Sequence, residues 1–323
     1  MGERKRLYYI DVLRVIATIM VVCIHVSVWY MDRIGSTQFV IGYAINSVSR
    51  VCIGLFLMIT GTLWLSRGIE ISINSEKFFK ISCKLFLMFI LWNVLYSFRV
   101  HSKGFSFRFG GAYHLWYLVL ASILYAFIPS LAYLSDRLKA DVFLVCFMFG
   151  IALYSFGNLF NSSRSIDTIL GEMLGYIGYV LVGYLLSKEK EYNRKKKVVF
   201  ILIYLVMFSV RTVMGVWDAV EKVGISEKNF GYNFVGVFLE SILIFLIVKN
   251  IKFNKQNKLI MFLSRYSFGI YLVHVAVVYV LEHFGIFKIT PMFLGIVLVL
   301  VVSSISSYIL NKIPGVKWLV RLN

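Results

Sequence analysis

The sequence predicts an all-α polytopic membrane protein, a bundle of about ten transmembrane helices with both termini in the cytoplasm. Apolar residues make up 59% of the 323 residues, only 15% are charged, and the mean hydropathy is +0.80. The apolar residues form continuous runs of roughly twenty residues, the length that an α-helix needs to cross a bilayer. Because the runs do not alternate in short blocks, a membrane β-barrel is disfavoured.

Ten apolar runs are expected to form the spans. They cover residues 9–31, 39–66, 78–98, 112–134, 141–160, 168–187, 197–216, 231–250, 258–282 and 291–311. The loops between them are too short for a separate soluble domain, so we expect one membrane-embedded domain over residues 1–323. No small-residue cleavage site follows the first run, which we therefore interpret as a retained span rather than a signal peptide.

The orientation follows from the basic residues of the loops. With the N-terminus inside, the inner segments carry 21 Lys and Arg residues and the outer segments carry 8, which favours cytoplasmic termini. The basic loop at 99–111 is the exception. The net charge of +18 would suggest nucleic acid in a soluble protein, but here it lies in short loops and indicates anionic membrane lipids as the partner.

Cysteine chemistry is not expected. The four cysteines, Cys23, Cys52, Cys83 and Cys146, all fall within apolar runs, and none belongs to a CxxC pair. The sequence therefore predicts neither a disulfide framework nor a metal site.

Arg14 and His25 are the first candidate functional residues, because both interrupt the first apolar run. Eleven helical steps are about three turns, so the two side chains should share a face roughly 16 Å apart along the axis. Ionisable side chains within a span are costly and are functional candidates by default. A neutral imidazole can take a proton from a hydroxyl near pH 7, which makes His25 a candidate general base. The alternative is a core histidine bonded to a neighbouring helix.

Three cations, Arg14, Lys84 and Arg265, are placed in the inner half of the membrane by the span assignment. Such a cluster would suit a polyanion that enters from the cytoplasm. The alternative is that each side chain extends to the interface or pairs with a neighbour.

Glu240 is the most deeply placed carboxylate, about ten residues from either end of its run. A carboxylate at that depth needs a partner, and His25 and Arg211 are the available choices. A Glu–His pair would raise the basicity of the imidazole, which makes Glu240 a candidate catalytic residue. A Glu–Arg pair would brace two consecutive helices instead.

Two further motifs carry polar groups into the predicted bundle. Ser267, Tyr271 and His274 form a polar stripe on an otherwise apolar run, which indicates either a cavity or hydrogen bonding between helices. His114 and Trp116 open the fourth run at the outer surface. They fit an aromatic belt at the interface, or a platform on which a sugar ring stacks.

The ordered set of motifs resembles the acyltransferase-3 family, integral membrane enzymes that O-acylate bacterial glycans. The set is Asp11-x-x-Arg14, the Arg-x10-His spacing to His25, Gly61 after an apolar run, His114-Leu-Trp-Tyr, and Ser267-x-x-x-Tyr271-x-x-His274. It extends from the first run to Lys312-Ile-Pro314. The second-run motif departs from the usual pattern, because it lacks the Pro and paired Phe before the final glycine, and this leaves the substrate class open.

The resemblance implies an O-acetyltransferase-like enzyme, transferring groups other than aminoacyl groups, in a single acyltransferase domain. Its donor would be cytoplasmic acyl-CoA, acetyl-CoA in the first instance, and its acceptor a carbohydrate or lipid-linked glycan outside the membrane. The implied setting is the bacterial inner membrane and polysaccharide modification, with no permanently bound cofactor. His25 matches the essential histidine of the family and Arg14 the essential arginine.

The residues and the resemblance suggest the same mechanism. Arg14, with Lys84 and Arg265, would hold the CoA phosphates, and His25 would deprotonate the acceptor hydroxyl for direct transfer. Two other functions stay open: a transporter or flippase for a polar lipid or small solute, and a membrane sensor subunit. The sequence shows neither an internal repeat nor a pair of Gly/Pro-broken spans, which disfavours a transporter.

Overall fold

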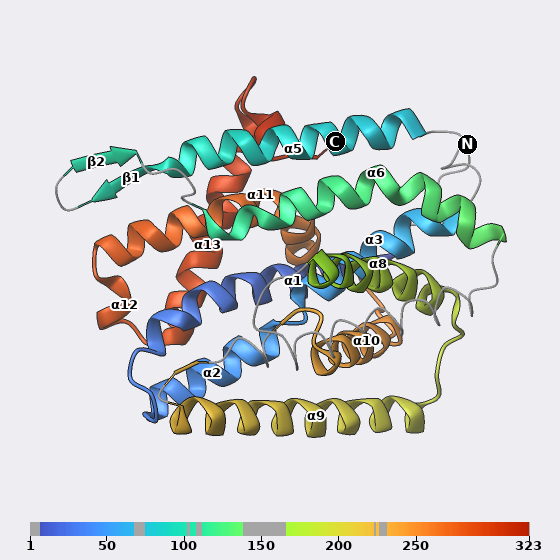
Figure 1. Ribbon diagram of the computed structural model, residues 1–323, viewed down its shortest axis with the longest axis horizontal. Coiled ribbons are helices and arrows are strands. Elements are labelled where there is room, and N and C mark those ends of the chain that lie inside the picture. The colour runs from blue at the N-terminus through green and yellow to red at the C-terminus, as the bar shows by residue number, and fades with distance from the viewer. Residues whose placement is uncertain are drawn as a thin grey trace. The chain divides into compact units, whose positions relative to one another are not determined.

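The computed structural model describes residues 7–67, 75–101, 104–107, 112–137, 166–222, 224–225 and 231–322, and these are mostly helical (Figure 1). Within these residues, seven helical segments are long and apolar enough to cross a membrane. They are Tyr8–Tyr30, Thr37–Trp64, Ser75–Ser97, Tyr113–Leu134, Arg194–Glu221, Lys258–His283 and Met292–Lys312. The helical membrane class is thereby supported, while the count of ten spans and the cytoplasmic termini stay predictions.

Two more of the predicted runs are also helical. The run at 168–187 lies in α8 (Ile166–Lys188), and α10 (Val235–Lys249), which has 15 residues, covers most of the run at 231–250. The run at 141–160 lies outside the described residues.

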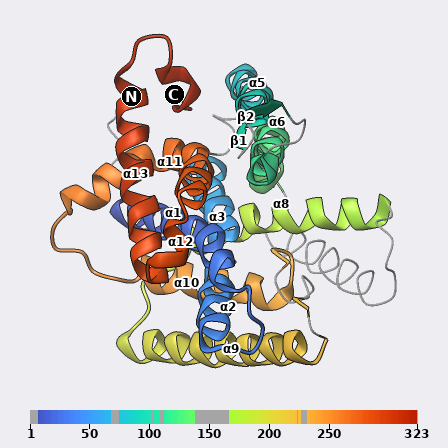
Figure 2. The same cartoon turned by 90° about the vertical axis from the view of Figure 1, so that its left-hand side faces the viewer.

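The chain divides into two compact units, the first made of residues 1–66 and 138–265, the second of residues 67–137 and 266–323. The first unit contains α1 (Tyr8–Ser27), α2 (Thr37–Ser49), α3 (Cys52–Trp64), α8, α9 (Arg194–Glu221), α10 and the start of α11 (Lys258–His283). α1 packs against α2, α3 and α10, and α9 lies beside α2 and α10 (Figures 1 and 2).

Polar side chains mark where several helices of this unit begin. The hydroxyl of Ser36 accepts a hydrogen bond from the Phe39 amide at the start of α2, and the Asn193 side chain accepts one from the Lys196 amide at the start of α9. Such side chains satisfy amide groups that have no partner within the helix. The predicted second span is broken: Arg50 and Val51 separate α2 from α3.

Two glycines bring α3 and α8 into backbone contact. A side chain on Gly61 of α3 would collide with the main chain of Val180 on α8, and one on Gly183 of α8 would collide with the main chain of Met58 on α3. The Thr62 hydroxyl donates a hydrogen bond of 2.9 Å to the Gly183 carbonyl at the same crossing. Small residues permit such an approach between membrane helices, where a polar bond adds to the packing.

The second unit contains α5 (Ser75–Ser97), α6 (Trp116–Arg137), most of α11, α12 (Ile286–Ile289) and α13 (Met292–Lys312). α5 and α6 run side by side (Figures 1 and 2). Their hydroxyls at Ser82 and Ser122 lie 3.1 Å apart. The short 3₁₀ helix η5 (Lys317–Leu319) joins α5 through a 3.0 Å hydrogen bond from the Trp92 indole to the Leu319 carbonyl.

A short hairpin follows α5 and was not predicted. β1 (Phe98–His101) pairs antiparallel with β2 (Gly104–Phe107), with Phe98 opposite Phe107 and His101 opposite Gly104. It occupies part of the basic loop between the third and fourth runs. The spans were predicted from apolar runs long enough to cross a bilayer, and strands this short give no such pattern, so the segment was expected to be a loop.

Candidate functional site

Arg14 is held by two polar groups of the first unit. Its Nη1 donates a 3.0 Å hydrogen bond to the Ser264 hydroxyl on α11 and lies 3.5 Å from Oδ1 of Asp11, three residues earlier on α1. The Ser264 hydroxyl in turn donates a 2.6 Å hydrogen bond to the same Asp11 oxygen. The three side chains therefore form a closed cluster between α1 and the start of α11.

The cluster leaves the cation accessible and hides the acid. The Arg14 side chain is 27% exposed and that of Asp11 is 4% exposed. Asp11 and Ser264 fix the position of the guanidinium, which is the fork-shaped group suited to phosphate oxygens. The i,i+3 spacing of Asp11 and Arg14 already places both on one face of the first run, but the sequence does not bring Ser264 to Arg14.

His25 lies in the last turn of α1, and a 3₁₀ turn, η1 (Val28–Tyr30), follows directly. Its side chain is half-buried, as is that of Arg14, whereas its neighbours Ile24 and Val26 are buried. Its place near the end of α1 brings it close to the junction between α1 and α2.

Asn46 is a polar residue near His25 that was not predicted from the sequence. Its Nδ2 donates hydrogen bonds to the Ile24 carbonyl at 3.1 Å and to the Ser27 hydroxyl at 3.0 Å. Asn46 lies on α2 and is 1% exposed. An amide within an apolar run needs partners just as an ionisable group does, and this requirement was available from the sequence.

Glu240 is paired with Arg211, one of the two partners that the sequence left open. Arg211 Nε donates to Oε1 at 2.8 Å and Nη2 donates to Oε2 at 2.5 Å. The two side chains are 6% and 0% exposed for Arg211 and Glu240, respectively. Nη2 also donates to the Ser47 carbonyl at 2.8 Å, so the pair connects α9, α10 and α2. This geometry matches a brace between helices.

The other two predicted cations have different surroundings from Arg14. Arg265 follows Ser264 directly on α11, but its side chain is exposed. Lys84 belongs to α5 of the second unit, where its Nζ donates a 3.2 Å hydrogen bond to the Leu322 carbonyl.

The second unit brings His114, Tyr271 and His274 together. The His114 ring lies 5.6 Å from the Tyr271 ring and 5.2 Å from the His274 ring, both edge-on. The Tyr271 hydroxyl donates a 2.8 Å hydrogen bond to the His114 carbonyl, and His274 Nδ1 lies 2.7 Å from the Tyr271 carbonyl. Tyr96 completes the group, with its ring 5.1 Å from that of His114.

This aromatic cluster is buried rather than open to the surface. His114 is 3% exposed and His274 is 0% exposed, and Ser267 of the same stripe is also buried. Trp116, by contrast, is 37% exposed and its neighbour Tyr113 is 55% exposed. Trp116 and Tyr113 are therefore accessible at the surface of this unit, whereas His114 is not.

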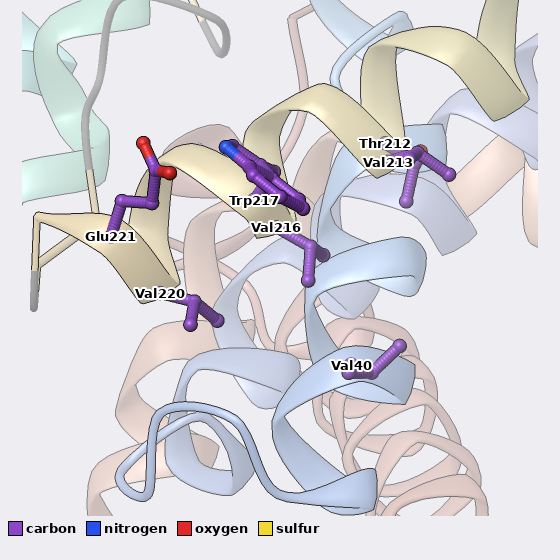
Figure 3. Close-up of a pocket in the computed structure, with 7 residues that line it drawn as sticks. All are labelled: Val40, Thr212, Val213, Val216, Trp217, Val220 and Glu221. Carbon is purple, nitrogen blue, oxygen red and sulfur yellow. The ribbon is translucent and has the colours of Figure 1, made fainter.

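An apolar pocket of about 370 Å³ lies on the first unit, lined mainly by α9. Figure 3 shows its lining residues, Val40, Thr212, Val213, Val216, Trp217, Val220 and Glu221. None of them is a predicted site residue, and α9 exposes apolar side chains along most of its length. In a membrane-spanning helix such a surface is expected to face lipid chains.

Comparison with known proteins gives one match. The family model of the acyltransferase-3 proteins, described as "Acyltransferase domain", matches residues 7–312. No curated protein and no solved structure matches the sequence. The family match covers nearly the whole chain and includes every candidate residue discussed above.

Proposed function

The chain belongs to the acyltransferase-3 family, and from this premise we propose that it moves an acyl group from cytoplasmic acyl-CoA to a hydroxyl of an extracytoplasmic glycan or lipid-linked sugar. The seven membrane-type helices agree with a multi-pass membrane enzyme, which we place in the bacterial inner membrane. The observation that carries the proposal is that one helix, α1, bears both a fixed, partly exposed Arg14 and a half-buried His25.

Arg14 is assigned to the donor. Asp11 and Ser264 hold its guanidinium in one place, so that binding a phosphate of CoA needs little further ordering of the side chain. His25 lies about three turns away on the same face, roughly 16 Å along the axis. An extended donor with its phosphates at Arg14 would bring its thioester toward His25. Acetyl-CoA is the simplest such donor.

His25 is assigned the role of general base. Its imidazole takes the proton of the acceptor hydroxyl as the oxygen attacks the thioester carbonyl carbon, which forms a new C–O bond. The C–S bond then breaks, and CoA leaves as a thiolate that takes the proton back from the imidazolium. Neither an acyl-enzyme nor an added reagent is needed to balance this transfer.

The acceptor is assigned to the exposed aromatic residues at the start of the fourth run. Trp116 and Tyr113 offer accessible rings, and aromatic faces suit the apolar faces of sugar rings. The buried His114, Tyr271 and His274 would support this surface from behind. That Arg265 and Lys84 help Arg14 to hold the donor phosphates stays a prediction.

The test is acyl transfer by the purified protein. Wild type should release CoA from labelled acetyl-CoA and pass label to a bacterial glycan and lipid-sugar extract, whereas a transporter or sensor would do neither. His25→Ala should lower the rate about 100- to 10,000-fold, the usual loss on removing a general base. His283→Ala is the matched control, because His283 is exposed at the end of α11. Wild-type turnover by a well-folded His25→Ala protein would remove His25 from the mechanism.

A further inference from the structure

We propose that Asn46 is a positioning residue, which fixes the end of α1 that carries His25. The geometric part of this inference stands on hydrogen bonds within the first unit. Its effect on turnover rests on the proposed function, in which His25 is the base.

The end of α1 is held from outside the helix. Carbonyl groups in the last turn of a helix lack partners within it and are satisfied by other donors. Asn46 supplies such a donor, because its Nδ2 donates to the Ile24 carbonyl at 3.1 Å and to the Ser27 hydroxyl at 3.0 Å, and the Ser27 hydroxyl itself donates to the Ile24 carbonyl at 3.2 Å. Ile24 and Ser27 lie on either side of His25, just before the α-helix changes to the 3₁₀ turn η1. One side chain thus binds both flanks of the histidine.

Asn46 can make these bonds in one orientation of its amide. Arg50 Nε donates a 3.0 Å hydrogen bond to Asn46 Oδ1, so the oxygen faces Arg50 and the NH₂ group faces α1. A flipped amide would place its oxygen against the Ile24 carbonyl and its NH₂ against a guanidinium donor, and both contacts would be repulsive. Arg50 therefore sets the direction in which Asn46 donates.

The helix that carries Asn46 is itself anchored. The next residue, Ser47, accepts a 2.8 Å hydrogen bond at its carbonyl from Arg211 and a 3.0 Å bond at its hydroxyl from Thr212. Glu240 on α10 holds Arg211 through two hydrogen bonds. α9 and α10 thus fix α2, and Asn46 extends this rigid frame to the end of α1.

Loss of the Asn46 donor should displace His25 without disturbing Arg14. Misplacing a catalytic group by about 1 Å can lower a rate about 100-fold, so we expect kcat to fall roughly 10- to 100-fold. Arg14 is held separately by Asp11 and Ser264, about three turns away, so KM for acetyl-CoA should change little.

The experiment uses Asn46→Asp, which keeps an acceptor for Arg50 and removes both donor bonds to α1. Asn233→Asp is the matched control: Asn233 is 3% exposed, lies in the same unit, and donates through Nδ2 to the Glu172 carbonyl. Ser27→Ala is a milder second variant, in case the aspartate impairs folding: it removes one acceptor of Asn46 together with the bond from the Ser27 hydroxyl to the Ile24 carbonyl, and it keeps the bond from Asn46 to that carbonyl. All variants are made in the full-length protein.

The first readout is ¹⁵N NMR of protein labelled at its five histidines. The His25 signal is identified by its loss in His25→Ala. In Asn46→Asp and Ser27→Ala this signal should shift, and in Asn233→Asp it should stay. The second readout is kcat and KM for acetyl-CoA, measured by CoA release, with the melting temperature of each variant as a folding control.

The outcomes separate this inference from the proposed function. An unmoved His25 signal in both Asn46→Asp and Ser27→Ala overturns the inference. If His25→Ala is inactive but Asn46→Asp and Asn233→Asp have the same kcat, the inference is overturned as well. If His25→Ala keeps full turnover while the His25 signal moves in Asn46→Asp, then Asn46 does position the end of α1, but His25 is not the general base.

Discussion

Replacing Glu240 by Gln separates a structural role of this residue from a catalytic one. The change keeps the shape and one acceptor oxygen but removes the negative charge. Arg211, 6% exposed, would then be a buried cation without its counter-ion. Removing one partner of a buried ion pair costs about 3–5 kcal/mol, and the retained oxygen places Glu240→Gln near the lower value, about 3 kcal/mol.

The companion variant removes both charges. Arg211→Met with Glu240→Leu leaves no unpaired ion, and apolar side chains of similar size often replace a buried pair at little cost. The Ser47 carbonyl keeps a partner in this variant, because the Arg50 amide also donates to it at 3.2 Å. We therefore expect the double variant to regain most of the stability that the single variant loses, together with acyl transfer.

The assay is thermal unfolding in detergent alongside CoA release from acetyl-CoA. Asp218→Asn provides the control on the same helix, because its partner Lys222 is 66% exposed and Asp218 itself is 23% exposed, so this pair is far more accessible than Glu240–Arg211 and should contribute about 0–1 kcal/mol. If the Glu240→Gln protein melts like wild type but no longer transfers the acyl group, then Glu240 is not a structural brace between helices and instead takes part in catalysis. A double variant that is stable but inactive would likewise assign Glu240 or Arg211 to the chemistry.

Two further predictions concern the donor. Arg14→Ala should raise KM for acetyl-CoA more than it lowers kcat, and Arg14→Lys should rescue it in part, because an ammonium lacks the fork that binds two phosphate oxygens; a lower kcat at unchanged KM would contradict the role of Arg14 as a phosphate clamp. In oriented proteoliposomes, acylation of an outer acceptor should require acetyl-CoA on the face that bears the termini, as the 21 to 8 bias of basic loop residues indicates; equal activity with acetyl-CoA on the opposite face would exclude transfer across the membrane.

The helical membrane class was predictable, because continuous apolar runs of about twenty residues are typical of helices that cross a bilayer. The run that contains Arg14 and His25 forms a helix, as its apolar character indicated, and both side chains are half-buried. The break at Arg50 and Val51 was not predicted, because residues 39–66 were taken as one span and the polar residues that lead into the break, Asn46, Ser47, Ser49 and Arg50, were not used as a sign of it.

The partners of the candidate residues were less accessible from the sequence. Ser264 is 250 positions from Arg14, and nothing local relates them. Arg211 was one of two choices for Glu240, and hydropathy alone does not choose between them. Asn46 was predictable in principle, since an amide in the middle of an apolar run requires hydrogen-bond partners, but the candidates within the first two runs were chosen among ionisable side chains.

The contact between α3 and α8 has a mechanical consequence. Because the two backbones meet at Gly61 and Gly183, the helices are pressed against each other without an intervening side chain at this crossing. A bilayer that becomes thinner or thicker makes its helices change tilt. When the bilayer thickness changes, we expect α3 and α8 to change their tilt by rotating about the crossing at Gly61 and Gly183, without moving apart. The first unit would then keep its interior arrangement in bilayers of different thickness, with the glycine crossing as its fixed pivot.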